Sequence, residues 1–272
     1  MNADRPLDAR AFEWLRTNIA LGSGFGESYA QLRAHGFSDK AIAQALDQLA
    51  PRGDALAGGR LEAPPLVRRA PPNLRRIENP KIELYALDDF MSAEDCLRLI
   101  EFAAGHLIAS PVTSDGGDPY FRTSKTCLLA HLRTPLGLEI DARICRTLGI
   151  RPAYGEGIQV QRYDVGEEFK THTDYFEPGT RTHRSFATLR GNRTWTFMVY
   201  LNEGMEGGGT RFADIDTVVQ PKLGMALLWN NLHPDGSPNT ATHHSGEPVT
   251  SGHKVIITKW FRTRGDGPVF YE

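Results

Sequence analysis

The spacing of apolar residues changes along the chain, from a helical period in the first half to short, turn-bounded runs in the second. Within residues 1–50, this spacing predicts a small all-α module of three short helices. The signals are an apolar stripe from Ala11 to Ile19, a segment at 27–34 that ends before Gly36, and an N-cap at Ser38 before a stripe from Ile42 to Leu49.

Two roles are open for this module: it could bind a peptide or a partner helix, or it could be an appendage packed on the main domain. Residues 51–76 differ from their surroundings because prolines, glycines and arginines crowd together there. Such a segment cannot sustain a helix or a central strand. We therefore predict a linker at 51–76, followed by a second domain at 77–272.

The second domain begins with helices and continues with strands. Ser92 and Thr134 are suitable N-caps, and Pro135 fits a first helical turn. Strand-like runs follow at 157–163, 194–201, 217–219, 225–229 and 254–261. This order predicts an α+β fold. Given the metal-ligating residues described below, we expect a double-stranded β-helix (jelly roll) core backed by helices.

The strongest chemical signal is the pair His172 and Asp174, with His244 further along the chain. On an extended backbone, residues two apart point to the same face, so the first two side chains can reach one ion. A histidine from another strand would complete a set of two histidines and one carboxylate. Non-haem Fe(II) oxygenases use this set because it leaves coordination positions open for a co-substrate and O₂.

Lys254 strengthens the interpretation as an oxygenase. A lysine among Val255, Ile256 and Ile257 is costly to bury unless it meets an anion. Alternation places Lys254, Ile256, Thr258 and Trp260 on one face of the predicted strand. That face suits a pocket with a cationic floor, where a dicarboxylate would chelate the metal at one end and pair with the ammonium group at the other.

Composition removes some other functions. The chain has 31 basic and 33 acidic residues and no basic, aromatic-rich groove, so we expect no nucleic-acid partner. No apolar run is long enough to span a bilayer, and the first ten residues do not resemble a signal peptide. The three cysteines lack metal-type spacing, which favours reduced core thiols. These features lead us to expect a cytoplasmic protein.

Two competing functions use the same residues. A zinc hydrolase can also use two histidines and a carboxylate, but the chain lacks a helical His-Glu-x-x-His motif and Lys254 would have no role. An inactive oxygenase fold that binds a partner through the N-terminal helices is the alternative from another class. The complete ligand set and the lysine argue against it.

The region from Ile82 to Arg262 resembles the prolyl 4-hydroxylase-type family of 2-oxoglutarate, Fe(II)-dependent dioxygenases. The resemblance rests on several motifs in the correct order: Arg122-Thr123-Ser124, residues 156–160, Arg162-Tyr163, His172-x-Asp174-Tyr175-Phe176, Tyr200-Leu201-Asn202, Gly207-Gly208, and His244 followed by Pro248-Val249, Gly252 and Lys254. The family spacing to Pro248 and Lys254 selects His244 over His243 as the ligand. Two departures, Phe169 and Gly209, stand where the family often has tyrosine and glutamate.

The resemblance implies Fe(II), 2-oxoglutarate and O₂ as cofactor and co-substrates, with ascorbate as a reductant. It further implies that Tyr163 and Tyr200 help Lys254 and Thr258 to hold 2-oxoglutarate, and that Arg193 and Trp260 line the substrate side. The substrate it implies is a prolyl residue in a peptide or protein; a free amino acid or small metabolite is the alternative. The polar insertion from Tyr175 to Arg193 is a candidate for a mobile loop that closes over the substrate.

Overall fold

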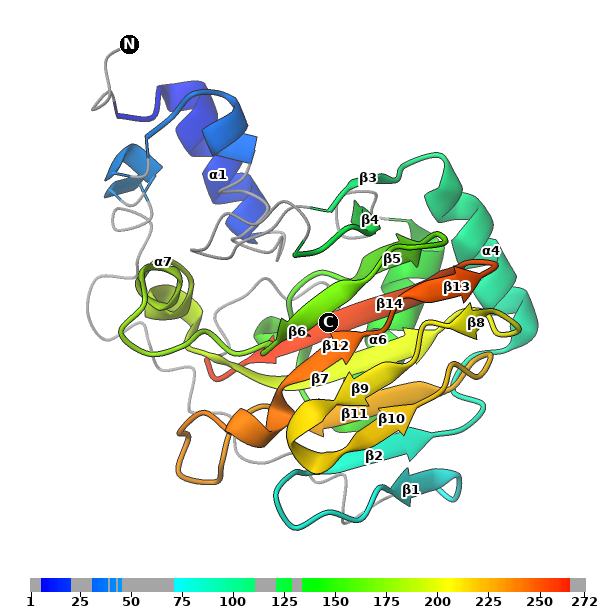
Figure 1. The fold of residues 1–272 in the computed structure, drawn as a ribbon. Helices are drawn as coiled ribbons and strands as arrows, with labels where there is room; N and C mark the ends of the chain where they lie inside the picture. Colours follow the sequence, from blue (N-terminus) through cyan, green and yellow to red (C-terminus); the bar gives the residue numbers. More distant parts are fainter. Residues whose placement is uncertain are drawn as a thin grey trace.

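Two antiparallel sheets lie face to face, and helices cover the outer side of the larger one (Figure 1). The computed structural model describes residues 6–20, 31–38, 40–42, 44–45, 71–110, 121–128 and 134–264. The larger sheet has eight strands in the order β1-β2-β11-β7-β14-β5-β4-β3. Their bounds are Leu74–Arg76, Leu84–Leu87, Ala226–Asn230, Arg193–Tyr200, Lys254–Arg262, Gln159–Tyr163, Lys125–Leu128 and Ile108–Ala109.

The smaller sheet has four strands in the order β10-β9-β12-β6, with bounds Thr217–Val219, Thr210–Phe212, His244–Gly246 and Phe169–His172. A two-stranded ribbon of β13 (Val249–Ser251) and β8 (Glu206–Gly207) adjoins it. Short 3₁₀ helices occur at Pro152–Tyr154, Ala213–Ile215 and Thr240–Thr242. The expected α+β fold with a double-stranded β-helix core is confirmed.

The two helices that back the larger sheet begin at the expected N-caps. In α4 (Ala93–Ala104), the Ser92 side chain accepts a hydrogen bond from the Asp95 amide. In α6 (Pro135–Leu148), the Thr134 side chain accepts from the Gly137 amide, and Gly149 ends the helix in the left-handed region at φ 68°. Their apolar faces, including Leu99 and Ile140, form one buried cluster with Phe197, Val199, Val255, Ile257 and Phe261 of the sheet.

A second apolar cluster fills the space between the sheets. It contains Met198, Tyr200 and Ile256 from the larger sheet and Phe212 from the smaller one. Strand β14 therefore divides its residues as the alternation predicted: Val255, Ile257 and Phe261 meet the helices, while the other face turns toward the smaller sheet. The candidate site lies on this second face, near one end of the inter-sheet core.

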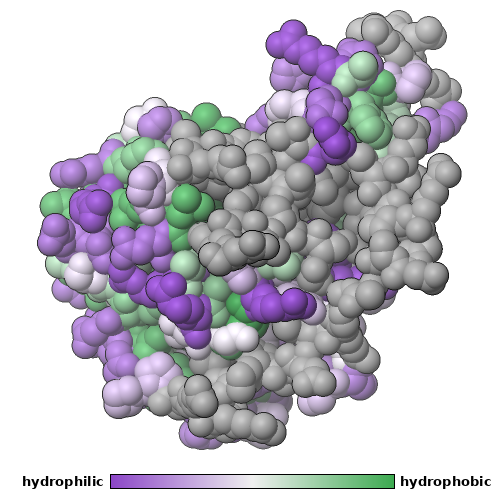
Figure 2. Space-filling model, turned by 180° about the vertical axis from the view of Figure 1, so that it is seen from behind, coloured by the Kyte–Doolittle hydropathy of each residue, from purple (hydrophilic) through white to green (hydrophobic). Residues whose placement is uncertain are grey.

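The N-terminal helical module agrees with the sequence wherever it is described. Helix α1 spans Ala9–Ala20, residues 31–34 are helical, Gly36 has φ 85°, and Ser38 Oγ accepts from the Ala41 amide before further helical residues. The remainder of the predicted second and third helices lies outside the described residues. Figure 2 shows the described part of the module as a protrusion with apolar surface beside strongly polar surface.

Two segments differ from the expectations. Residues 74–76, which we assigned to the linker, form strand β1, whose direct partners are residues 85–87 of β2. This strand is at the edge of the sheet, where a neighbouring proline costs no ladder hydrogen bond. The sheet domain therefore extends upstream of residue 77, while 51–70 lies outside the described residues and the linker there stays a prediction.

The predicted loop from Tyr175 to Arg193 contains a helix, α7 (Arg181–Arg190), so the interpretation as a long loop was wrong. Thr180 caps this helix by accepting from the His183 amide. Arg262 donates hydrogen bonds to the carbonyl oxygens of Phe186 and Gly191, which anchors the C-terminal end of the helix to β14. No helix among the described residues has both the length and the apolar character needed to cross a membrane.

Candidate metal centre and co-substrate pocket

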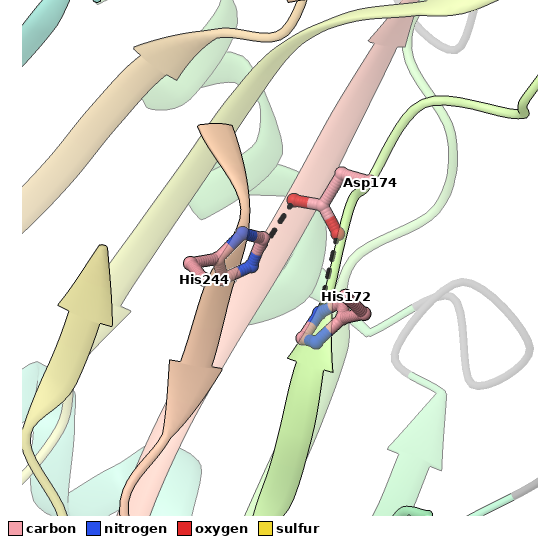
Figure 3. A group of neighbouring side chains, drawn as sticks. All are labelled: His172, Asp174 and His244. Carbon is pink, nitrogen blue, oxygen red and sulfur yellow. Dashed lines mark ion pairs between the residues drawn. The ribbon is translucent and has the colours of Figure 1, made fainter. Parts of the chain in front are cut away.

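His172, Asp174 and His244 converge on one point, and one potential ligand atom from each lies within 4.8 Å of the others (Figure 3). Strands β6 and β12 pair antiparallel, and His172 is the direct partner of His244. Asp174 follows the end of β6 and turns its carboxylate between the two rings, with its oxygens 3.8 Å from the two Nε2 atoms. Strand register therefore brings together His172 and His244, which are 72 positions apart in the sequence.

Both imidazoles are oriented by a backbone carbonyl. The Nδ1 atom of His172 lies 2.8 Å from the Lys170 carbonyl oxygen, and that of His244 lies 2.9 Å from the Thr242 carbonyl oxygen. A carbonyl only accepts, so each Nδ1 carries a proton, and Nε2 is the ring atom that a neutral imidazole in this orientation offers to a metal. This is the arrangement that metal-ligating histidines require.

The ionisation states also suit a metal. Burial, helped by the nearby His244, lowers the pKa of His172 to about 3, so this ring is neutral at physiological pH. Burial by itself would raise the pKa of Asp174, but His244, His172 and Arg193 outweigh it and lower that pKa. A neutral imidazole and an ionised carboxylate are the ligand forms that bind divalent metals.

Asp174 is held by a relay of hydrogen bonds that sequence reasoning missed. Thr196 Oγ1 donates to Asp174 Oδ2 at 2.7 Å, Asn231 Nδ2 donates to Thr196 Oγ1 at 2.8 Å, and Trp229 Nε1 donates to Asn231 Oδ1 at 3.0 Å. These residues come from β7 and from β11 with the turn after it, and all of them are buried. No short sequence motif joins them to the metal ligands.

Lys254 lies inside the pocket next to this centre. Its side chain is 2% exposed, and its Nζ donates to the Gly208 carbonyl oxygen at 2.8 Å and lies 4.5 Å above the Tyr163 ring. Burial lowers the pKa of Lys254 to about 8, although the carboxylate of Glu247 acts in the opposite direction. A buried amine with one carbonyl partner is suited to receive an anionic ligand.

The other predicted co-substrate residues divide into two groups. Tyr163 and Thr258 line the same pocket as Lys254, the three metal-site residues and Trp260. Tyr163 donates to Gln161 Oε1 at 2.9 Å, and Gln161 Nε2 donates to Thr258 Oγ1 at 3.3 Å. Tyr200 is not part of the lining; its hydroxyl donates to Thr210 Oγ1 at 2.7 Å, and Thr210 lines the pocket instead.

Phe169 stacks directly on the metal-site histidine. Its ring centroid is 3.5 Å from that of His172, with 16° between the planes, and the Arg122 guanidinium lies 5.0 Å from the centroid of the same ring. Arg122 also donates to the hydroxyls of Ser124 and Thr126. The departure from tyrosine at position 169 therefore leaves an apolar ring that supports a ligand, and the Arg122-Thr123-Ser124 motif lies beside it.

On the predicted substrate side, Arg193 and Trp260 lie against each other, with the guanidinium carbon 4.0 Å from the indole ring. Arg193 donates two hydrogen bonds to Glu156, of 2.7 and 2.8 Å. Nε of Arg262 lies 2.9 Å from the same carboxylate, an ion-pair contact that is not aligned as a hydrogen bond. Trp260 Nε1 is buried and has no hydrogen-bond partner among the described residues.

His243 lies apart from the cluster. It is exposed, and its Nδ1 contacts the Asp214 carboxylate at 2.9 Å.

A set of two histidines and one carboxylate between the sheets of a double-stranded β-helix, beside a buried lysine, defines the class of non-haem iron oxygenases that use an acidic co-substrate.

The comparisons with known proteins agree with this class. The family model described as the 2OG-Fe(II) oxygenase superfamily matches residues 158–262. The protein named probable prolyl 4-hydroxylase 10 of Arabidopsis thaliana is 32% identical over 206 residues, which are 67% of this chain and 69% of that protein. Prolyl 4-hydroxylase subunit alpha-1 of Bos taurus is 32% identical over 159 residues, which are 58% of this chain and 29% of that subunit.

Among solved structures, the viral collagen prolyl hydroxylase of Paramecium bursaria Chlorella virus-1, in its 2OG complex, aligns with a TM-score of 0.54 and 26% identity. The alignment covers 66% of this chain and 96% of the viral chain. The chain belongs to the prolyl 4-hydroxylase family of 2OG-Fe(II) oxygenases. It spans less than a third of the bovine alpha-1 subunit that it matches.

Proposed function

We propose that the protein is a 2-oxoglutarate- and Fe(II)-dependent dioxygenase that hydroxylates a prolyl residue in a peptide or protein. One observation carries the proposal: the metal-ligand cluster and the buried ammonium group of Lys254 line the same pocket. In the reaction, one oxygen atom of O₂ enters succinate as 2-oxoglutarate loses CO₂, and the other becomes the hydroxyl group on the substrate carbon.

The residues present fit iron. The donor set consists of Nε2 of His172, Nε2 of His244 and a carboxylate oxygen of Asp174, all facing one point and all supported by hydrogen bonds. Iron bound there supplies the redox chemistry that neither the protein nor the substrate has. The protein contributes the ligand geometry and a buried surrounding that limits access of water.

Lys254 has the second role in the proposed reaction. Its ammonium group pairs with the distal carboxylate of 2-oxoglutarate, while the 2-oxo acid end of the molecule faces the metal ligands. Tyr163 forms one wall, and Thr258 lies on the same strand face as the lysine. A charge-assisted contact of this kind contributes about 2 kcal/mol and fixes the direction in which the co-substrate lies.

The substrate side is proposed at Trp260 and Arg193. The indole ring lines the pocket, and its buried N–H is available to a hydrogen-bond acceptor on the substrate. An aromatic surface beside a guanidinium suits a peptide, because the ring packs against a pyrrolidine while polar groups bind main-chain carbonyls. The names of the Arabidopsis and bovine relatives point to prolyl residues as the target.

Two further parts of the proposal concern conditions. Ascorbate is proposed as the reductant that restores Fe(II), as the family resemblance implies. A cytoplasmic location is supported by the three cysteines, which are free and buried, the state that reducing compartments maintain.

The test measures succinate release and hydroxylated product with Fe(II), 2-oxoglutarate and a panel of proline-containing peptides, with free amino acids as a separate arm. His244→Ala removes a proposed ligand and should abolish both products. His243→Ala, at the neighbouring exposed position, is the matched control and should retain them. Absence of 2-oxoglutarate turnover under all conditions would reject the dioxygenase, whereas hydroxylation of a free amino acid alone would reject the peptide substrate.

A further inference from the structure

The N-terminal module and the sheet domain share one buried apolar cluster. Leu15, Leu32, Ile42 and Ala45 of the module belong to it, and so do Phe186 and Ala187 of helix α7. Phe176, which follows the metal-site Asp174 by two positions, is the remaining buried member. Figure 1 shows α1 above α7, on the side of the molecule where β6 ends. The module therefore packs against a segment that leads directly to the metal centre.

Phe176 is fixed on its backbone and on its ring. Asn192 accepts a hydrogen bond from the Phe176 amide at 2.7 Å and donates one to its carbonyl oxygen at 2.9 Å. The ring lies 4.9 Å from the guanidinium carbon of Arg193 and 4.8 Å from that of Arg262. Phe176 thus lies between the module's apolar core and two cations of the sheet domain.

These two cations share a single buried carboxylate. Arg193 and Arg262 both contact Glu156, which is 3% exposed. Because both guanidinium groups are cationic, they repel each other, and their positions depend on the groups that contact them. Both guanidinium groups contact Glu156, and both also lie against the Phe176 ring, which belongs to the apolar cluster shared with the module. Arg193 in turn lies against Trp260, which lines the pocket.

We infer that the N-terminal helical module is a positioning element for the substrate side of the site, acting through Phe176 on Arg193 and thereby on Trp260. The inference rests on the proposed function, since it assigns Arg193 and Trp260 to the substrate side. It gives the module a role that does not need a peptide or partner to bind there. Loosening the module lets water reach the Phe176 ring and the guanidinium groups, which weakens the interactions that hold Arg193 in place.

The consequence is that 2-oxoglutarate turnover becomes less tightly coupled to hydroxylation of the substrate. Displacing substrate-positioning groups by about an ångström can cost on the order of a hundredfold in rate, while Lys254, held by the Gly208 carbonyl and the Tyr163 ring, keeps its place. We therefore expect 2-oxoglutarate to be consumed with less hydroxylated product formed. A purely structural role for the module would lower both products together, in proportion to the folded fraction.

The experiment compares two neighbouring positions on α1 in the full-length protein. Leu15 is 1% exposed and belongs to the shared cluster, whereas Arg16 is exposed and pairs with Glu13 on the same helix. Leu15→Ala should reduce hydroxylated product per succinate at least about threefold, with the KM for 2-oxoglutarate within about twofold of wild type. Arg16→Ala should match the wild-type ratio. An unchanged ratio in Leu15→Ala would overturn the inference.

A second variant keeps the inference testable if Leu15→Ala does not fold. Phe176→Leu keeps an apolar side chain in the cluster but removes the aromatic contact with both guanidinium groups, and it should lower the ratio in the same direction. If it leaves the ratio unchanged, the route through Phe176 is wrong.

A readout independent of activity separates this inference from the proposed function. Hydrogen–deuterium exchange of the Phe176 and Arg193 amides, both of which donate to Asn192 Oδ1, should be faster in Leu15→Ala and unchanged in Arg16→Ala. This result would support the coupling even if no peptide were hydroxylated. Equal exchange in both variants would refute it even in an active enzyme.

Discussion

The amine of Lys254 lies 4.5 Å above the ring of Tyr163, its direct partner across strands β14 and β5. The ring surface attracts the cation but does not neutralise it. Among the described residues, the amine donates a hydrogen bond only to the Gly208 carbonyl, and no carboxylate forms an ion pair with it. The buried ammonium group is therefore suited to bind an anion, which in the proposed reaction is the distal carboxylate of 2-oxoglutarate.

Replacing this lysine tests that role directly. Lys254→Ala removes a charge-assisted contact of about 2 kcal/mol, so the KM for 2-oxoglutarate should rise about thirtyfold. The measurement is succinate formation against 2-oxoglutarate concentration. Lys222→Ala, which removes an exposed lysine paired with Asp88, is the control and should not change the KM. A wild-type KM in Lys254→Ala would remove the lysine from co-substrate binding.

The same amine predicts a pH dependence of co-substrate binding. Its pKa is lowered to about 8, chiefly by burial, so it carries a proton below that pH and loses it above. Since only the protonated amine attracts the carboxylate, affinity should be constant below about pH 7.5 and fall by up to about tenfold per pH unit above pH 8. Equilibrium binding of 2-oxoglutarate to the Mn(II)-loaded protein between about pH 6.5 and about pH 9.5 would measure this dependence.

Lys254→Arg provides the control for this profile, because a guanidinium stays charged throughout the range. Its profile should therefore be flat, whatever its affinity at neutral pH. An identical fall above pH 8 in both proteins would assign the titration to another group.

The geometry of the metal centre depends on Thr196. Its hydroxyl donates to Asp174 and accepts from Asn231, so Thr196→Val frees the carboxylate to rotate and leaves the Asn231 amide without that acceptor. Loss of such a supporting hydrogen bond typically weakens metal binding by about 10- to 100-fold. Titration with Mn(II) or Fe(II) measures the change. Thr217→Val, on β10, is a matched control; metal affinity equal in the two variants would contradict the proposed support.

Much of this site was predictable because its signals are local. The spacing of His172 and Asp174 and the alternation from Lys254 to Trp260 follow from strand geometry, and the structure places these side chains as the pattern predicts. Thr196 and Asn231 could not be found in this way, since only the register of β7 and β11 brings them near Asp174. Likewise, the resemblance implied that Tyr200 helps to hold 2-oxoglutarate, but its side chain lies in the inter-sheet core and its hydroxyl donates to Thr210, which lines the pocket instead.

Helix α7 shows a different limit of prediction from the sequence. Its sequence is polar and basic, which favoured a loop, and among its described side chains Phe186 and Ala187 are the buried apolar ones. Thr180 as an N-cap was a usable signal for its start. Its stability depends on distant residues, namely Arg262 at its C-terminal carbonyls and the N-terminal module on its apolar side. Neither contact is visible in the local pattern.

The buried carboxylate of Glu156 should be important for stability as well as for the substrate side. Burial alone would raise its pKa, but Arg193, Arg262 and Arg190 outweigh it and lower the pKa to about 2. Glu156→Gln leaves the guanidinium groups of Arg193 and Arg262 buried without their shared counter-charge, which should cost about 3–5 kcal/mol and lower the Tm markedly. Glu139→Gln, at an exposed residue paired with Arg143, should leave the Tm unchanged.

The Tm difference between wild type and Glu156→Gln should change with pH in a definite direction. Because the pKa of Glu156 is lower in the folded state than its ordinary value of 4.5, its stabilising effect is complete above about pH 4.5. As the pH falls from there toward 2, the unfolded state takes up a proton first and the effect is lost. The Tm gap between wild type and Glu156→Gln should therefore be constant near neutral pH and narrow in acid, as thermal unfolding at a series of pH values would show. A gap that stays constant down to about pH 3 would mean that folding does not lower the pKa of Glu156, and Arg193 and Arg262 would then not stabilise its ionised form.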